Sequence, residues 1–287
     1  MRLSLHYSPC PNDTFIFHAL AAGLVRVPGV DFEVRLADVE RLNEVAGCGG
    51  ADICKVSVAA AAAVLGEYRI RRAGGAMGRG VGPILVGRTF AGAEGTTLEA
   101  LHGKRVAIPG RRTTANLLFG LLCKARGIVP ELVELVYDEV MPAVKAGDCA
   151  AGVVIHEGRF TFAQQGLARL LDLGAWWEEA YGLPIPLGCI VMRRSLGVEL
   201  AGAVDEGIRA SLRHARMHPE AGRDYIRQHA QEMDEAVIRQ HIGTFVTDHS
   251  LEIGHEGEAA ILALLTEAQG GKKVPEDVFL PEQGAGA

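Results

Sequence analysis

The stretch Ala151–Thr161 (AGVVIHEGRFT) decides how the rest of the chain is interpreted. Its apolar run 153–155 predicts a buried strand, and the polar residues that follow place His156 at the carboxyl end of that strand. Open α/β sheets bind their ligands at this end of their strands. His156 is therefore a candidate general base, with Glu157 and Arg159 as charged neighbours that could tune it. A structural histidine that caps the strand is the alternative.

The sequence predicts neither a metal nor an organic cofactor. The zinc-protease motif would require a second histidine where Phe160 stands. His214 and His218 are one helical turn apart, but Pro219 follows them, and zinc needs three or four converging ligands. There is no P-loop, and the glycine-rich run 74–83 leads into a strand, whereas a dinucleotide fingerprint opens a helix.

Length and composition indicate a globular protein of two domains. The chain has 287 residues, 48% of them hydrophobic and 22% charged, and its formal net charge of -6 argues against a nucleic-acid binder. The N-terminus lacks the apolar core of a secretion signal, and the longest apolar run, 56–65, is too short to span a bilayer. We therefore expect a cytoplasmic protein whose partner is a small-molecule substrate, with no nucleic acid and no membrane. The sequence specifies no oligomeric state.

Six cysteines lie far apart in the chain without any C-x-x-C pair, which predicts reduced thiols rather than a disulfide framework. They are Cys10, Cys48, Cys54, Cys123, Cys149 and Cys189. Cys10 lies in a polar loop with two prolines and is the one that could be reactive. The sequence assigns it no histidine partner for catalysis.

Three segments share the order of a short strand, a polar loop and a helix. They comprise strand 3–7 with loop 8–14 and helix 15–24, strand 52–56 with Ser57 before helix 58–66, and strand 104–108 with loop 109–114 and helix 115–125. Helix N-termini bind anionic or polar ligands. Lys55, Arg111 or Arg112 could add positive charge there. Ordinary capping, including capping of the first helix by residues 12–14, and a surface lysine at position 55 are the alternatives.

Strands that alternate with helices predict an α/β fold with a mainly parallel sheet. Residues 89–102, with Gly92 and Gly95, look like a crossing into a second domain. After residue 198 we predict helices over 199–217, 220–230, 234–247 and 256–268, followed by a tail, 270–287, that is at most partly ordered.

Several of these segments together resemble one family, the 1,4-dihydroxy-6-naphthoate synthases of the futalosine route to menaquinone. The resemblance runs in order from about residue 3 to about residue 265, and the motifs that carry it are SPCPNDTF (8–15), KVS (55–57), GRGVGP (78–83), TTA (113–115), IHE with RFT (155–161) and DLG with WW (172–177). The first and fifth of these motifs are the most specific. Cys54 departs from the pattern, because a threonine usually precedes the lysine.

The resemblance implies a two-lobed type II periplasmic-binding-protein-like fold of the α/β class, with a ligand cleft between the lobes. We expect lobe I to comprise 1–88 and 188–287 and lobe II to comprise 89–187, with 83–88 and 187–193 as hinge strands. The implied activity is a lyase reaction that converts cyclic dehypoxanthinyl futalosine to 1,4-dihydroxy-6-naphthoate and a dihydroxyacetone fragment. The family's base falls on His156. Its substrate-binding positions fall on Lys55, Val56, Ser57, Thr114 and Ala115, and Asn12 and Asp13 of the first motif are further candidates.

Two alternatives share the same fold. One is a solute-binding protein, in which His156 would only hydrogen-bond a ligand, and the missing export signal argues against it. The other is a chorismate dehydratase of the same pathway. The PNDTF opening and the Ile155–Glu157 segment favour the synthase.

Overall fold

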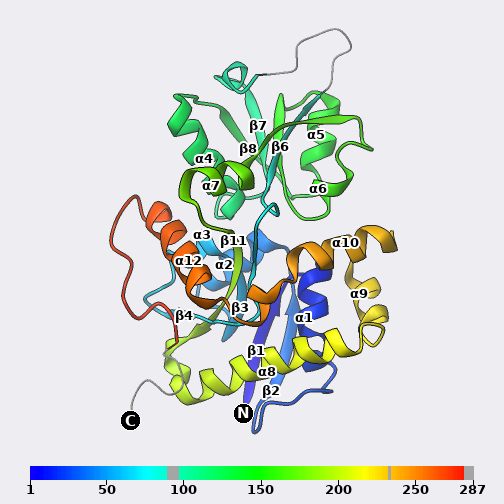
Figure 1. Cartoon of the computed structure of the whole chain (residues 1–287), viewed down its shortest axis with the longest axis vertical. Coiled ribbons are helices and arrows are strands. Elements are labelled where there is room, and N and C mark those ends of the chain that lie inside the picture. The colour runs from blue at the N-terminus through cyan, green and yellow to red at the C-terminus, as the bar shows by residue number, and fades with distance from the viewer. Residues whose placement is uncertain (89–96, 232–233, 281–287) are drawn as a thin grey trace. The chain divides into compact units, whose positions relative to one another are not determined.

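The computed structural model describes residues 1–88, 97–231 and 234–280. They form two compact units, one of Met1–Gly78 with Pro186–Ala287 (unit 1) and one of Arg79–Ile185 (unit 2). Each unit has its own β-sheet with helices packed on it, as Figure 1 shows. The expected fold class, two α/β lobes with a chain that crosses twice, is confirmed.

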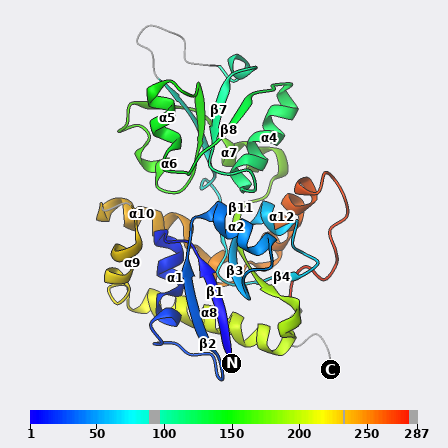
Figure 2. The same cartoon turned by 180° about the vertical axis from the view of Figure 1, so that it is seen from behind.

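Unit 1 is built on a mixed sheet of six strands in the order β2-β1-β3-β11-β4, with β5 paired to β11. The strands are β1 (Arg2–Tyr7), β2 (Asp31–Leu36), β3 (Ile53–Ser57), β4 (Tyr68–Ile70), β5 (Ala76–Gly78) and β11 (Ile185–Arg193). β1 is parallel to β2 and β3, whereas β11 runs antiparallel to β3 and β4. Figure 2 shows β1 and β2 side by side from behind.

The helices of unit 1 cover this sheet. They are α1 (Pro11–Ala21), α2 (Val39–Gly47), α3 (Val58–Ala61), α8 (Val198–Met217), α9 (Arg223–His229), α10 (Glu235–Phe245), α11 (Asp248–Leu251) and α12 (Gly254–Ala268). A 3-10 turn, Arg194–Leu196, precedes α8. One apolar core joins Leu5 of β1 and Phe17 of α1 to Ile208 and Leu212 of α8. Burial of these side chains is the main stabilising contribution of the unit.

Unit 2 has a five-stranded mixed sheet in the order β10-β6-β9-β7-β8. Its strands are β6 (Ile84–Arg88), β7 (Arg105–Ile108), β8 (Glu131–Glu134), β9 (Ala151–Val154) and β10 (Leu167–Asp172). Its helices are α4 (Thr114–Arg126), α5 (Val140–Ala146), α6 (Gly158–Thr161) and α7 (Leu173–Tyr181), with a 3-10 turn at Glu99–Leu101. β7 is parallel to β8 and β9, and β6 is antiparallel to β9 and β10.

Three expectations about the strands need correction. Both sheets are mixed rather than mainly parallel, because β6 and β11, which follow the crossings, run against their neighbours. The first crossing lies at Gly78, before β6 and not after it, because β6 pairs only within unit 2. The expected hinge strands β6 and β11 therefore belong to different sheets. Of the expected crossing 89–102, residues 89–96 lie outside the described residues.

The predicted helices after residue 198 are confirmed as α8, α9, α10 and α12. Two earlier helices differ from expectation. α1 begins at Pro11 with Cys10 as its N-cap, because proline suits the first position of a helix, so residues 12–14 lie within the first turn instead of capping it. α3 ends at Ala61, although its alanines favour a longer helix.

Of the tail 270–287, the structure describes residues 270–280, and the end of this segment contacts β4. The Ile70 N–H donates to the carbonyl of Val278 over 2.8 Å, and Ile70 and Phe279 form a parallel bridge. Val278 and Leu280 are buried. The apolar segment 278–280 thus packs along β4, a contact with a strand that is distant in the sequence.

Two glycines of unit 2, Gly82 and Gly174, pack backbone against backbone. A Cβ atom on Gly82 would lie 2.2 Å from the Gly174 Cα, and one on Gly174 would lie 2.6 Å from the Gly82 Cα. Neither main chain can move aside as a flexible side chain could. This contact requires glycine at both positions.

We expect Gly82→Ala to lower the free energy of unfolding by about 1–3 kcal/mol, because the added methyl group overpacks the contact. Urea denaturation followed by circular dichroism measures the loss. Gly120→Ala, in α4, is the matched control, since nothing lies within 4 Å of its added Cβ and alanine favours a helix interior. Equal midpoints for Gly82→Ala and the parent would contradict the packing argument.

Candidate active site

The parallel strands β1 and β3 bring two candidate segments to one edge of the sheet of unit 1. The loop from Ser8 to Cys10 follows β1, and Ser57 ends β3 and is the N-cap of α3. The carboxyl ends of parallel strands meet at the same edge, which is where α/β sheets bind ligands. Pairing of Leu5 with Ile53 and of His6 with Cys54 sets this register.

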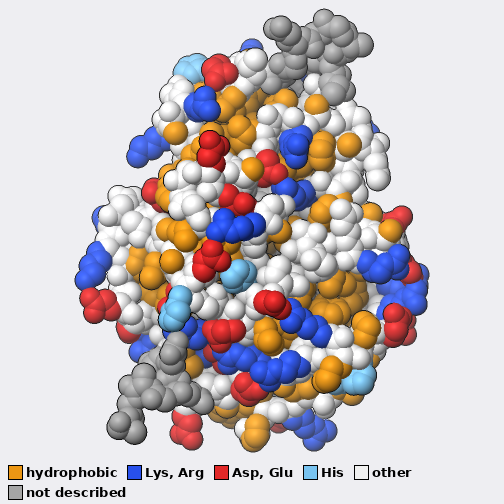
Figure 3. Space-filling view, in the orientation of Figure 1, with side chains coloured by type: hydrophobic (Ala, Val, Ile, Leu, Met, Phe, Trp, Pro, Cys, Tyr) orange, Lys and Arg blue, Asp and Glu red, His pale blue; other side chains and the backbone are white. Residues whose placement is uncertain are grey.

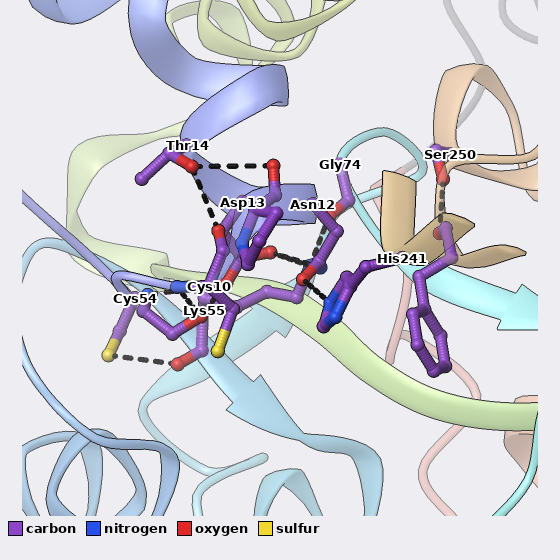
Figure 4. A network of polar contacts seen from close by, with 12 residues as sticks. Cys10, Asn12, Asp13, Thr14, Cys54, Lys55, Gly74, His241 and Ser250 are labelled. Carbon is purple, nitrogen blue, oxygen red and sulfur yellow. Dashed lines mark hydrogen bonds and ion pairs between the residues drawn. The ribbon is translucent and has the colours of Figure 1, made fainter. Parts of the chain in front are cut away.

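A buried ion pair joins the two segments (Figure 4). Lys55 Nζ lies 2.9 Å from Asp13 Oδ1, and the two side chains are 7% and 3% exposed. Nζ also donates to the Gly74 carbonyl over 2.7 Å. The alternative of a surface lysine is therefore wrong. The second oxygen of Asp13 accepts a hydrogen bond of 2.7 Å from the Ser8 hydroxyl.

Asn12 and His241 extend this network to α10. Asn12 Nδ2 donates to Asp13 Oδ1 over 2.8 Å, so the other end of its amide, Oδ1, faces His241 Nε2 at 3.0 Å. An amide oxygen only accepts, so His241 carries a proton on Nε2. His241 is fully buried, and sequence analysis did not detect its role, because a single histidine in a helix has no pattern that assigns a partner.

Neighbouring residues of β3 lie on opposite faces of the sheet. The Cys54 thiol lies 3.6 Å from the Leu42 carbonyl on α2, whereas Lys55 contacts Asp13 on α1. Burial raises the pKa of the Cys54 thiol to about 12, so it stays neutral. The departure from the family pattern at Cys54 thus falls on the face away from Lys55. Val56 has a buried side chain that packs in the core.

In unit 2 the first turn of α4 carries the candidates Thr114 and Ala115, and both side chains are buried. The N-cap is Thr113, whose Oγ1 accepts a hydrogen bond of 3.1 Å from the Asn116 N–H. Ordinary helix capping therefore accounts for the hydroxyl of Thr113. The hydroxyl of Thr114 does not cap α4. Arg111, expected to assist with an anion, forms an ion pair of 3.2 Å with Glu134 of β8.

His156 follows β9 after one intervening residue and is half-buried. Its φ of 55° makes it the one non-glycine residue with a positive φ in the part of the chain that the structure describes. A left-handed residue of this kind costs about 1–3 kcal/mol, and such residues concentrate at functional sites. The Tyr137 ring meets the imidazole edge-on, with 4.9 Å between ring centroids.

β7 and β9 are parallel, so the loop before α4 and His156 lie at the same edge of the unit 2 sheet. The prediction that His156 follows a buried strand is confirmed. Glu157 lies beyond the strand, because β9 ends at Val154, and it is the N-cap of α6.

Arg159 holds the glycine-rich loop before β6. Its guanidinium lies 2.6 Å from Asp172 Oδ2 and donates to the carbonyls of Gly82 over 2.5 Å and Gly80 over 2.8 Å. The other oxygen of Asp172 caps α7 through the Gly174 N–H at 3.0 Å. Hydrogen bonds and an ion pair therefore connect the glycine-rich motif to the DLG motif through Arg159, which lies three residues after His156.

The remaining sequence expectations concern metals, thiols and surfaces. Among the described residues, no group of three or more His, Cys, Asp or Glu side chains could hold a metal ion, and no helix is long and apolar enough to cross a membrane. Cys10, the one thiol that the sequence singled out as a candidate for reactivity, is buried, whereas Cys48 is exposed. On the face in Figure 3, acidic and basic side chains are interspersed rather than gathered by sign.

Comparison with known proteins identifies the family. The family model described as "Menaquinone biosynthesis" matches residues 3–269. The chain belongs to this menaquinone biosynthesis family. Members named 1,4-dihydroxy-6-naphthoate synthase include one from Thermus thermophilus, 50% identical over 93% of this chain and 94% of that protein, and one from Streptomyces coelicolor, 46% identical over 95% of both. The chain is accordingly an enzyme of menaquinone biosynthesis.

Solved structures share the fold of this chain. A crystal structure of a protein from Archaeoglobus fulgidus has a TM-score of 0.85 and 32% identity, covering 94% of this chain and 98% of that one. The periplasmic aliphatic sulphonate binding protein of Escherichia coli has a TM-score of 0.64 over 97% of this chain and 90% of its own. At 13% identity this likeness shows the fold alone, which is that of a periplasmic binding protein.

Proposed function

We propose that the chain is a carbon–carbon lyase that converts cyclic dehypoxanthinyl futalosine to 1,4-dihydroxy-6-naphthoate with release of a dihydroxyacetone fragment. The observation that carries the proposal is the 50% identity with the Thermus thermophilus synthase, which extends over 93% of the chain. The reaction would take place in the cytoplasm. Six cysteines without a disulfide suit a reducing compartment.

In the proposed mechanism His156 removes a proton from a hydroxyl group of the substrate. The resulting oxyanion collapses to a carbonyl, the adjacent carbon–carbon bond breaks in a retro-aldol sense, and its electron pair completes the aromatic naphthalene ring. Aromatisation supplies the driving force, so the enzyme chiefly has to position the substrate and accept the proton. Unit 1 would bind substrate through Asn12, Asp13, Lys55, Val56 and Ser57, and unit 2 through Thr114 and Ala115.

The deciding experiment is a mass-spectrometric assay of the purified protein with cyclic dehypoxanthinyl futalosine. We expect the substrate mass to disappear and the naphthoate mass to appear. Conversion of chorismate instead would assign the chain to the dehydratase reaction. Binding of the futalosine derivative without turnover would identify a solute-binding protein.

We expect Ser57→Ala and Thr114→Ala each to raise KM by tens-fold or more. Each hydroxyl lies at a helix start without capping it, and a hydrogen bond to a charged group contributes about 1.5–3 kcal/mol. Initial-rate kinetics measure the change, with Thr113→Ser, which keeps the capping hydroxyl, as the control. Parental KM values in both variants would remove these residues from the substrate site.

A further inference from the structure

Asn43, on α2, makes a two-point contact with Ser57 that the sequence did not predict. The Ser57 backbone N–H donates to Asn43 Oδ1 over 2.9 Å, and Asn43 Nδ2 donates to Ser57 Oγ over 3.2 Å. The two residues are 2% and 4% exposed. Ser57 is thus held at both its main chain and its side chain by one buried amide.

The chemistry of the neighbours fixes which way this amide points. A backbone N–H can only donate, so the oxygen of Asn43 must face Ser57 N. The second N–H of the amide faces Glu40 Oε2 at 3.3 Å, and a carboxylate only accepts. The Ser57 N–H and the Glu40 carboxylate require the same orientation of the Asn43 amide. Nδ2 is therefore the atom that faces the Ser57 hydroxyl.

The hydroxyl of Ser57 therefore accepts a hydrogen bond from Asn43, and its own proton must point elsewhere. It does not cap α3, and no acceptor for that proton is found among the described residues. A buried hydroxyl without an acceptor is unfavourable, and a ligand oxygen that accepts its proton removes the penalty.

We infer that Asn43 is a positioning residue that fixes the Ser57 hydroxyl as a hydrogen-bond donor, so that the substrate group bound there is an acceptor oxygen, such as a carboxylate or a carbonyl. The inference rests on the proposed function only in that Ser57 binds substrate. It deepens that function by specifying that the Ser57 hydroxyl donates, and does not accept, the hydrogen bond to the substrate. A substrate group that can only donate, such as an ammonium, would be rejected there.

The test replaces the donor that faces the Ser57 hydroxyl with an acceptor, without changing the shape of the side chain at position 43. In Asn43→Asp a carboxylate oxygen faces Ser57 Oγ. The hydroxyl then donates its proton to this carboxylate, so its hydrogen bond to the substrate is lost. Combining it with Glu40→Gln removes the charge repulsion that the new carboxylate would otherwise meet. We expect KM for the futalosine derivative to rise about 10- to 100-fold in this double variant, with kcat within a few-fold of the parent.

Two comparisons isolate the role of Ser57. Glu40→Gln alone is the matched control and should keep KM close to that of the parent, because Ser57 N–H still orients Asn43. In a Ser57→Ala background the change at position 43 should have no further effect, since the hydroxyl through which it acts is absent. Two results would overturn the inference. One is a parental KM in the double variant, and the other is a further rise in KM when the change at position 43 is added to Ser57→Ala.

A neutron structure of the deuterated parent separates this inference from the proposed function, because it needs no turnover. The deuteron on Ser57 Oγ should point away from Asn43. A Ser57 deuteron that points at Asn43 would overturn the inference even if the enzyme makes the naphthoate. If the parent does not convert the substrate while the deuteron lies as expected, the proposed function fails and the polarity of Ser57 stands.

Discussion

Replacing His156 with asparagine should lower kcat about 10²–10⁴-fold while the substrate still binds. Asparagine retains a hydrogen-bonding group of similar size but cannot accept and hold the proton. It is also among the few residues that tolerate a left-handed backbone, so the φ of 55° at this position is preserved. Single-turnover kinetics measure the chemical step, and equilibrium dialysis with the substrate measures binding.

The control for this prediction is Glu157→Gln, which removes the nearest alternative base. Glutamine keeps the size and the hydrogen-bonding capacity of the Glu157 side chain and removes only its charge and basicity. We expect turnover of this variant to remain within about tenfold of the parent, well short of the loss that removal of a general base causes. Parental turnover in His156→Asn, together with an inactive Glu157→Gln, would transfer the role of base to Glu157.

Replacing Lys55 with methionine should lower the free energy of unfolding of unit 1 by about 3 kcal/mol, because the change leaves the buried carboxylate of Asp13 without its counter-charge. The loss falls at the lower end of the range for such changes, since Ser8 and Asn12 still donate to Asp13. Urea denaturation, with hydrogen exchange of unit 1 amides as a local measure, gives the change.

Lys273→Met provides the matched control, because Lys273 pairs with Glu276 at side-chain exposures of 81% and 86%. Removing such a surface pair should change stability by less than about 0.5 kcal/mol. Combining Lys55→Met with Asp13→Asn should recover part of the loss, because no unpaired charge remains. A Lys55→Met protein as stable as the surface control would show that the buried pair contributes nothing to folding.

Those elements whose signal is local could be predicted from the sequence. The apolar periodicity of the helices after residue 198 predicted α8, α9, α10 and α12 close to their observed positions, and the alternation of strands and helices predicted the α/β class. His156 could be placed because an apolar run directly precedes it. The sequence did not specify which hydroxyl of the adjacent pair Thr113 and Thr114 caps α4, and the structure shows that Thr113 is the N-cap.

The features that sequence reasoning missed depend on contacts between distant segments. His241 lies 229 positions from Asn12, its hydrogen-bond partner, and nothing in a single sequence links the two. Asn43 looks like an ordinary residue of a short amphipathic helix until Ser57 is seen beside it. The direction of β6 was missed for the same reason, since strand pairing is set by the whole sheet and not by the strand's own residues.

The two strands at the crossings, β6 and β11, each pair with a strand that carries or precedes a candidate residue. β11 passes into unit 1 at Pro186, and its Gly188 pairs with Ser57, whereas β6 follows the other crossing and its Ile84 pairs with Val154, just before His156. A single pair of the β-ladder therefore joins β11 to Ser57, and a single pair joins β6 to Val154, two residues before His156. The segments that link the units are thus continuous with strands that pair directly with β3, which ends at Ser57, and with β9, which precedes His156.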